Sequence, residues 1–210
     1  HDALPISIVA AASLLTGAVG AVSLAGVSPA FRELFGITSE EQAKNLGIVQ
    51  MNQVFEDKNG SGATVTVKEA AADQEQFYIL VEFAAPEGTV LPEPDQVEEG
   101  FNRAVLWGGP DGRGIGFGAY RDESCTSFIG SSEAGYAIDY VEDSDPTDNK
   151  MEFIIRGHID PMPKDAAYCL FSGIQSLCMQ YQGEWVTMLD GMDIDLIVPL
   201  VGMGTHYDFQ

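Results

Sequence analysis

After residue 50 the chain is a series of short segments in which apolar and polar residues alternate, and this pattern restricts the fold more than any other feature. In residues 63–68, Val65 and Val67 fall on one side of an extended chain, while threonine and lysine fall on the other. Period-two alternation is typical of β-strands, because successive side chains point to opposite faces. Similar segments occupy residues 77–83, 104–107, 114–120, 126–129, 136–141, 152–159, 168–174, 184–189 and 193–200.

The breaks between these segments are rich in glycine, proline, aspartate and asparagine, which favour turns. Helical patterns of about 10–15 residues, which would indicate an alternating α/β fold, do not separate the segments. The pattern therefore predicts an all-β protein, an antiparallel β-sandwich of the immunoglobulin-like or jelly-roll-like type. Segment 77–83, FYILVEF, is nearly apolar on both faces, and we expect it at the centre of a sheet.

The N-terminal part has a different character. Residues 6–27, ISIVAAASLLTGAVGAVSLAGV, form a run of 22 residues without a charged side chain. About 20 apolar residues in a helix cross a hydrocarbon core about 30 Å thick, so we expect one transmembrane helix or signal anchor in residues 1–27. The alternatives are a signal peptide cleaved after Ser23-Leu24-Ala25 and a helix buried in a soluble protein. The anchor and the signal peptide both place residues from about 28 onward outside the cytoplasm.

Residues 28–50 are predicted to be a juxtamembrane linker with a short helix. Pro29 precedes an amphipathic turn that Gly36 ends, and Ser39 followed by two glutamates is typical of a helix N-terminus. The β-sandwich is expected over residues 51–201, and residues 202–210 are expected to begin a linker or a following domain. The opening HDALPIS resembles a translated sequencing adaptor, so we also expect the natural start of the protein to be missing.

The order of several short sequences resembles a known family. Ser28-Pro29-Ala30-Phe31 follows the apolar run directly, and then come GIVQ at 47–50, GATVTVKEA at 62–70, FYILV at 77–81 and PEGT at 86–89. This order resembles the bacterial domain-of-unknown-function 4179 family, in which a membrane helix leads through a SPAF-like junction to a β-rich outer domain. The late Gly183-Glu184-Trp185 is similar to that family's closing strand.

The resemblance implies a location and a type of action. Members of the family are similar to membrane-anchored anti-sigma factors of Gram-positive bacteria, in which a short cytoplasmic region precedes the helix. It therefore implies a single-pass protein of the bacterial cell membrane, whose contact with a sigma factor lies in a cytoplasmic region outside this chain. The family brings no established catalytic residues, so we expect no enzyme activity and no cofactor.

One acidic loop is a candidate metal site. In EDSDPTDNK, residues 142–150, the side chains of Asp143, Asp145, Asp148 and Asn149 offer the oxygen ligands that Ca²⁺ prefers. The spacing lacks the glycine and the distal glutamate of an EF-hand loop. A solvated hairpin tip built on Asp-Pro and Asp-Asn turns is the competing interpretation.

The three cysteines leave two interpretations open. Cys169 and Cys178 are nine positions apart and would close a small loop if they formed a disulfide outside the cell. In that case Cys125 is left over. Cys169 lies in an apolar predicted strand, where a cysteine also serves as a small buried hydrophobic residue.

Four weaker patterns have simpler structural explanations. Residues 112–118 are rich in glycine but lack the helix that a phosphate loop requires, and such glycines let a backbone or an aromatic ring pack closely. His158 and Asp160 share one face of a predicted strand, where a hydrogen-bonded histidine is the ordinary interpretation. Carboxylate pairs for glycoside hydrolysis would come from Glu184, Asp190, Asp193 and Asp195. A carbohydrate-stacking platform would come from Trp107, Tyr136, Tyr140, Tyr168, Phe171 and Trp185.

Net charge excludes one class of partner. The chain has 10 Lys and Arg against 32 Asp and Glu, a formal net charge of −22, and this field repels the phosphate backbone of nucleic acids. The sequence therefore predicts a non-catalytic sensing or interaction domain with an extracellular ligand or protein as its partner. The alternative is a secreted or surface-anchored calcium-dependent carbohydrate-binding protein, or a hydrolase, that uses the acidic loops.

Overall fold

Antiparallel strands make up most of the structure, a computed structural model that describes residues 22–91, 104–107, 116–131, 134–141, 145, 147–159, 162–174, 176–189 and 194–203. Within these residues, twelve strands form three sheets. Every pair of neighbouring strands is antiparallel. The prediction of an all-β protein is confirmed at this level.

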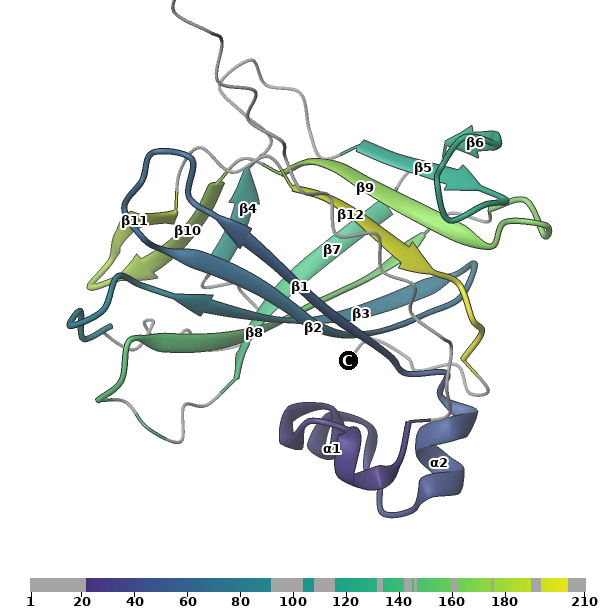
Figure 1. The fold of residues 1–210 in the computed structure, drawn as a ribbon, viewed down its shortest axis with the longest axis horizontal. Helices are drawn as coiled ribbons and strands as arrows, with labels where there is room; N and C mark the ends of the chain where they lie inside the picture. Colours follow the sequence, from purple (N-terminus) through teal and green to yellow (C-terminus); the bar gives the residue numbers. More distant parts are fainter. Residues whose placement is uncertain are drawn as a thin grey trace, which may run out of the picture.

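The three sheets differ in size, and Figure 1 shows their arrangement. Sheet A has the strand order β1 (Val49–Glu56), β2 (Thr64–Ala72), β3 (Gln76–Ala84), β8 (Lys150–Ile159) and β7 (Ala134–Val141). Sheet C has the order β12 (Ile194–Pro199), β9 (Tyr168–Ile174), β5 (Gly116–Tyr120) and β6 (Phe128–Ser131). Sheet B has the order β11 (Glu184–Leu189), β10 (Ser176–Tyr181) and β4 (Ala104–Trp107).

The main hydrophobic core lies between sheet A and the other two sheets. Alternate residues of β2 and β3, such as Val67 and Ile79, contribute one side of this core. Phe171 and Val198 from sheet C and Met179 from sheet B contribute the other side. In Figure 1 the strands of sheets B and C accordingly lie on one side of sheet A.

A second core covers the opposite face of sheet A. It joins a helical stretch, here called the N-terminal segment (residues 22–48), to the outward-facing residues Ala71, Tyr78, Leu80 and Ile154. The segment contains η1 (Leu24–Gly26), α1 (Pro29–Phe35) and α2 (Glu40–Asn45), which Figure 1 places across sheet A from sheets B and C. Strand β3 lies in the middle of sheet A and is buried on both faces, which confirms the prediction made for residues 77–83.

Two helix ends in the N-terminal segment, at Gly36 and at Ser39, lie where the sequence predicts them. Ser28 is the N-cap of α1, and Gly36 ends that helix in the left-handed conformation with φ of 60°, which glycine adopts without steric cost. Ser39 and Gln42 form a capping box at the start of α2. The short helices expected in this region are confirmed.

The predicted membrane helix over residues 6–27 is not supported. Its last residues do not continue a helix: Ser23 is extended, Leu24–Gly26 is a single 3₁₀ turn, and Val27 is only 2% exposed in the second core. Within the described part of the chain, no helix has the length and apolar character needed to span a membrane. Residues 6–21 of the prediction lie outside the described residues.

The segment expected to be a linker, residues 28–50, is packed against sheet A instead of extending away from it. Phe31 is 0% exposed and Leu46 4% exposed, because both contribute to the second core. Strand β1 already begins at Val49, inside the expected linker.

The sequence pattern does not predict two of the observed strands, β1 and β10. In β1 the alternation is broken, because Gln53 is the register partner of the core residue Val67, and Val54 is 60% exposed. Asn52 in the same strand has a positive φ of 48° and lies within a register shift, typical of a β-bulge. Strand β10 begins two positions after β9 ends, so no turn sequence separates these strands of two different sheets.

Gly157 in β8 is expected to be intolerant of any side chain. A Cβ atom at this position would lie 2.2 Å from the carbonyl oxygen of Gly135 and 2.5 Å from Cζ of Phe77. We predict that Gly157→Ala lowers the free energy of unfolding by about 1–3 kcal/mol, because the added methyl group displaces the Phe77 ring in the core. Urea denaturation measures the change. The matched control is Gly130→Ala, whose nearest neighbour would be 3.6 Å away; an equal loss in both variants would contradict this explanation.

Candidate functional site

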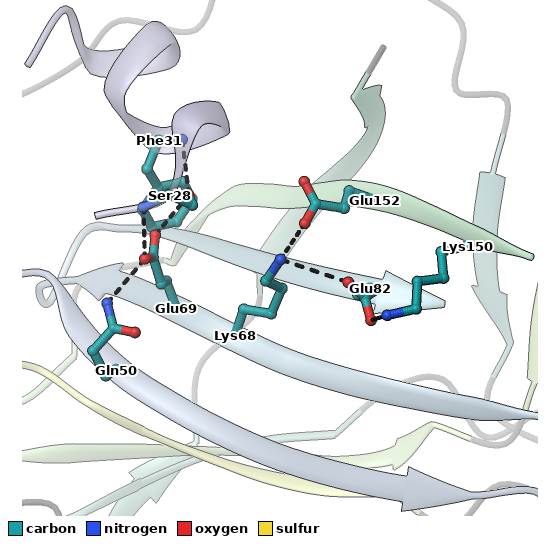
Figure 2. Close-up of polar contacts among 8 residues, drawn as sticks. All are labelled: Ser28, Phe31, Gln50, Lys68, Glu69, Glu82, Lys150 and Glu152. Atoms are coloured by element: carbon teal, nitrogen blue, oxygen red, sulfur yellow. Dashed lines mark hydrogen bonds and ion pairs between the residues drawn. The ribbon is translucent and has the colours of Figure 1, made fainter. Parts of the chain in front are cut away.

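A polar site that joins several elements of the fold lies on the face of sheet A that carries the N-terminal segment. A β-bulge in β2 creates it: Val67 pairs with Val81 and Glu69 with Leu80, so Lys68 is an extra residue. A bulge lets two consecutive side chains lie on the same face of a sheet. Lys68 and Glu69 therefore both point outward, away from the main core (Figure 2).

Glu69 is the buried carboxylate of this site, with 3% of its surface exposed. Its Oε1 accepts hydrogen bonds from the Ser28 backbone N–H at 2.8 Å and from Gln50 Nε2 at 2.9 Å. Its Oε2 accepts a hydrogen bond from Ser28 Oγ at 2.8 Å. Gln50 Nε2 also donates to the carbonyl oxygen of Gly26 at 2.9 Å. A buried charge is tolerated only when it is well hydrogen-bonded, and Glu69 meets this condition.

The conspicuous sequence Ser28-Pro29-Ala30-Phe31 has a structural explanation at this site. Ser28 Oγ accepts a hydrogen bond from the Phe31 N–H at 3.2 Å while it donates to Glu69. Pro29 occupies the first turn of α1, where its missing N–H carries no cost. Phe31 is fully buried in the second core. The four residues therefore start the helix and attach it to sheet A.

Lys68 lies beside this site and bridges two strands. Its Nζ contacts Glu152 on β8 and lies 3.6 Å from Glu82 on β3, and Lys150 Nζ lies 3.3 Å from the other oxygen of Glu82 (Figure 2). Burial opposes the charge of Lys68, but the hydrogen bonds and charges of Glu152 and Glu82 outweigh it and raise the pKa of Lys68 above its ordinary value. The ammonium therefore remains charged in neutral solution.

In chemical terms this arrangement connects elements of the fold. Each oxygen of Glu69 has a donor from Ser28 or Gln50, and Lys68 is paired with carboxylates of two neighbouring strands. Neither Glu69 nor Lys68 is among the site residues that the sequence predicts. The detectable signal was the sequence VKEA at residues 67–70, where two consecutive charged residues interrupt an alternating strand.

The calcium candidates are engaged in local turns. Asp145 Oδ1 accepts hydrogen bonds from the Thr147 hydroxyl at 2.6 Å and N–H at 3.2 Å, which lower the pKa of the Asp145 carboxyl. Asp148 Oδ1 accepts from the Lys150 N–H at 2.7 Å, and the side-chain amide of Asn149 donates to the Ala85 carbonyl. Asp143 lies outside the described residues. Among the residues that are described, no group of three potential ligands converges.

The predicted disulfide between Cys169 and Cys178 is not formed, and all three cysteines are free. Cys169 lies in β9 of sheet C, is 0% exposed and belongs to the main core. Cys178 lies in β10 of sheet B between two core residues, Leu177 and Met179, so it points to the opposite face. The alternative interpretation of Cys169 as a buried hydrophobic residue is the one that the structure shows.

The remaining sequence candidates do not converge on a site in the described residues. His158 is an exposed residue of β8, and Asp160 lies outside the described residues, as do Asp190 and Asp193. Gly118 belongs to β5, and no helix follows that strand directly. The Tyr120 ring lies over it, 2.9 Å from where a Cβ atom would be, as expected for a strand glycine.

The aromatic residues proposed as a platform are divided between environments. Phe171 is in the main core, and Tyr136 and Tyr140 pack against that core. Trp185 is 52% exposed on β11. Tyr168 is the register partner of Tyr120, whose ring contacts the exposed Phe128 ring with centroids 5.5 Å apart. The five of these residues whose side chains are described therefore do not form one platform; the side chain of Trp107 is outside the described part.

Comparison of the chain with family models, with curated proteins and with solved structures gives no match. The resemblance to the domain-of-unknown-function 4179 family therefore stays a prediction.

The environment of Cys169 predicts its reactivity. Burial, together with the nearby Cys125, raises the pKa of the Cys169 thiol to about 12, so at pH 8 only about one thiol in ten thousand is in the reactive thiolate form. We expect maleimide to label Cys169 only after unfolding, with mass spectrometry as the measurement. Cys169→Ala should leave native labelling unchanged. A mass gain of two hydrogens upon reduction of the untreated chain would instead reveal the disulfide.

Proposed function

We propose that this chain is the outer, non-catalytic sensing or interaction domain of a single-pass bacterial membrane protein related to anti-sigma-factor-like regulators. In this proposal residues 6–27 contain the membrane anchor, and residues from about 28 onward lie outside the cytoplasm. The partner is an extracytoplasmic ligand or protein. Contact with a sigma factor belongs to a cytoplasmic region outside this chain.

The observation that supports this proposal is the attachment of the N-terminal segment to sheet A. The proposed membrane region runs into a segment that contacts the sheet through the buried Glu69 and through a core of its own. A rigid attachment of this kind transmits a change in the β domain to the preceding residues, whereas a flexible linker does not.

We also propose that the finer architecture is a β-sandwich of the immunoglobulin-like or jelly-roll-like type. Support comes from the main core, which has sheet A on one side and sheets B and C on the other. The chain passes from β9 in sheet C to β10 in sheet B with one residue between them. Strands change sheets in this way at the corners of sandwiches.

The proposed location is tested by topology reporters. The chain, with an added initiator methionine, is fused after Met203 either to alkaline phosphatase or to green fluorescent protein and produced in bacteria. We expect an active phosphatase and a dark fluorescent protein, because the former matures only outside the cytoplasm and the latter only inside. Carbonate-washed membranes should retain the fusion if residues 6–27 anchor it; release would indicate the signal peptide. A fluorescent fusion with inactive phosphatase would contradict the proposal.

The proposed function and the calcium-dependent alternative predict different effects of Ca²⁺ on the stability of the protein. We expect Ca²⁺ at about 5 mM, above the dissociation constants of about 10⁻⁴–10⁻³ M of extracellular modules, to leave the unfolding midpoint unchanged. The described carboxylates of the loop already accept hydrogen bonds from their own turn. The alternative requires a stabilisation of about 1 kcal/mol or more that disappears in the triple variant Asp143→Asn, Asp145→Asn, Asp148→Asn. Thermal denaturation with and without calcium distinguishes the two.

A further inference from the structure

The N-terminal segment depends on sheet A for its own structure. Helix α1 has 7 residues and α2 has 6, and isolated helices of this length are not stable in water. Their capping interactions at Ser28 and Ser39 contribute too little to change this. The folded state of the segment therefore requires its contacts with the sheet.

Those contacts combine an apolar surface with the polar site at Glu69. Phe31 and Leu46 of the segment pack over Leu80 and Ile154. At the same interface Glu69 accepts two hydrogen bonds from Ser28, and Gln50 bonds both Glu69 and Gly26. If the segment leaves the sheet, water can hydrate Glu69 and Ser28. If Glu69 is replaced while the segment stays on the sheet, Ser28 and Gln50 lose their hydrogen-bond acceptor inside the interface. The resulting free-energy cost falls only on the state in which the segment contacts sheet A.

The end of the last described stretch is held by sheet A and by the same segment together. Met203 packs against the second core, and the Gly202 N–H donates to the Ala72 carbonyl at 3.2 Å. A Cβ atom at Gly47 would lie 2.6 Å from the Gly202 carbonyl oxygen, and Gly47 has a φ of 61°. Two parts of the chain more than 150 positions apart therefore meet at the boundary between α2 and β1.

We propose that the N-terminal segment is a releasable latch, which opens as one unit around Gly47 while the three sheets stay folded, and that Glu69 controls its opening. Release uncovers the apolar residues Tyr78, Leu80 and Ile154 of sheet A and removes the contacts of Gly202 and Met203 with the segment. The signalling use of the latch rests on the proposed function, because only a membrane-attached segment would be pulled from its N-terminal side. The latch itself does not depend on the location of the protein.

Native-state proteolysis of the full chain tests the latch. Trypsin can cut after Arg32 and Lys44 in the N-terminal segment and after Arg156 in the central part of sheet A. Cleavage of a folded protein follows the population of the open form when opening is fast. We expect Glu69→Ala to accelerate cleavage after Arg32 and Lys44 about tenfold to hundredfold, with cleavage after Arg156 unchanged. Mass spectrometry assigns each cut.

Two further variants and a second measurement make the test specific. Glu82→Ala removes a carboxylate from the same face, one that pairs with Lys68 and Lys150, and should not accelerate cleavage in the segment. Ser28→Ala keeps Glu69 but removes one of its donors together with the α1 cap. It should also accelerate cleavage in the segment, and it replaces Glu69→Ala in the test if that variant does not fold. Hydrogen exchange at the Leu46 amide, which donates to the Gln42 carbonyl inside the segment at 3.1 Å, should accelerate together with the cleavage.

The results that would overturn the latch differ from the result that would overturn the proposed function. Equal acceleration after Arg156 in Glu69→Ala and Ser28→Ala would show that the segment opens only when sheet A unfolds, and it would overturn the latch. Unchanged cleavage in both variants would show that Glu69 does not control opening, with the same consequence. Failure of the topology reporters would overturn the proposed function but leave the proteolysis result standing, so the two proposals fail separately.

Discussion

The arrangement of the other elements follows from the apolar residues that sheet A carries on both of its faces. A sheet covered on one face only can be polar on the other, but β3 carries Phe77, Ile79 and Val81 toward the main core and Tyr78 and Leu80 toward the second core. Sheets B and C cover the first face, and the N-terminal segment covers part of the second. Without the segment these outward apolar residues would face water, at a cost of about 25 cal/mol per Å² of exposed apolar surface.

The polar site at Glu69 gives this cover a defined position. Apolar contacts favour burial without specifying a particular geometry, whereas the hydrogen bonds from Ser28 and Gln50 to Glu69 are directional. The β-bulge at Lys68 makes the arrangement available, because it turns two neighbouring charged residues to the same face. Glu69 then meets the segment, while Lys68 joins the carboxylates of β3 and β8.

This organisation relates the physical structure to the proposed function. The same N-terminal segment contacts the centre of sheet A, the start of β1 and the residues that follow β12. A ligand that changes sheet A, or a force on the segment, would therefore affect a shared interface. The strongly negative net charge favours partners with basic surfaces over acidic ones, which adds a criterion for testing candidates for the proposed partner.

The sequence by itself determined the local features. Period-two alternation identified most strands, with β4, β9 and β11 at their observed bounds, and Gly36 and Ser39 marked two of the helix ends. These properties depend on neighbours within a few positions. Only the tertiary structure decided that the residues expected to be a linker cover a sheet, that Cys169 and Cys178 face opposite ways, and that Glu69 meets Ser28 from 41 positions away. β-Bulges, and the passage of the chain from one sheet to another, decide which distant residues meet. Both shift the register between distant segments without leaving a regular pattern in the sequence.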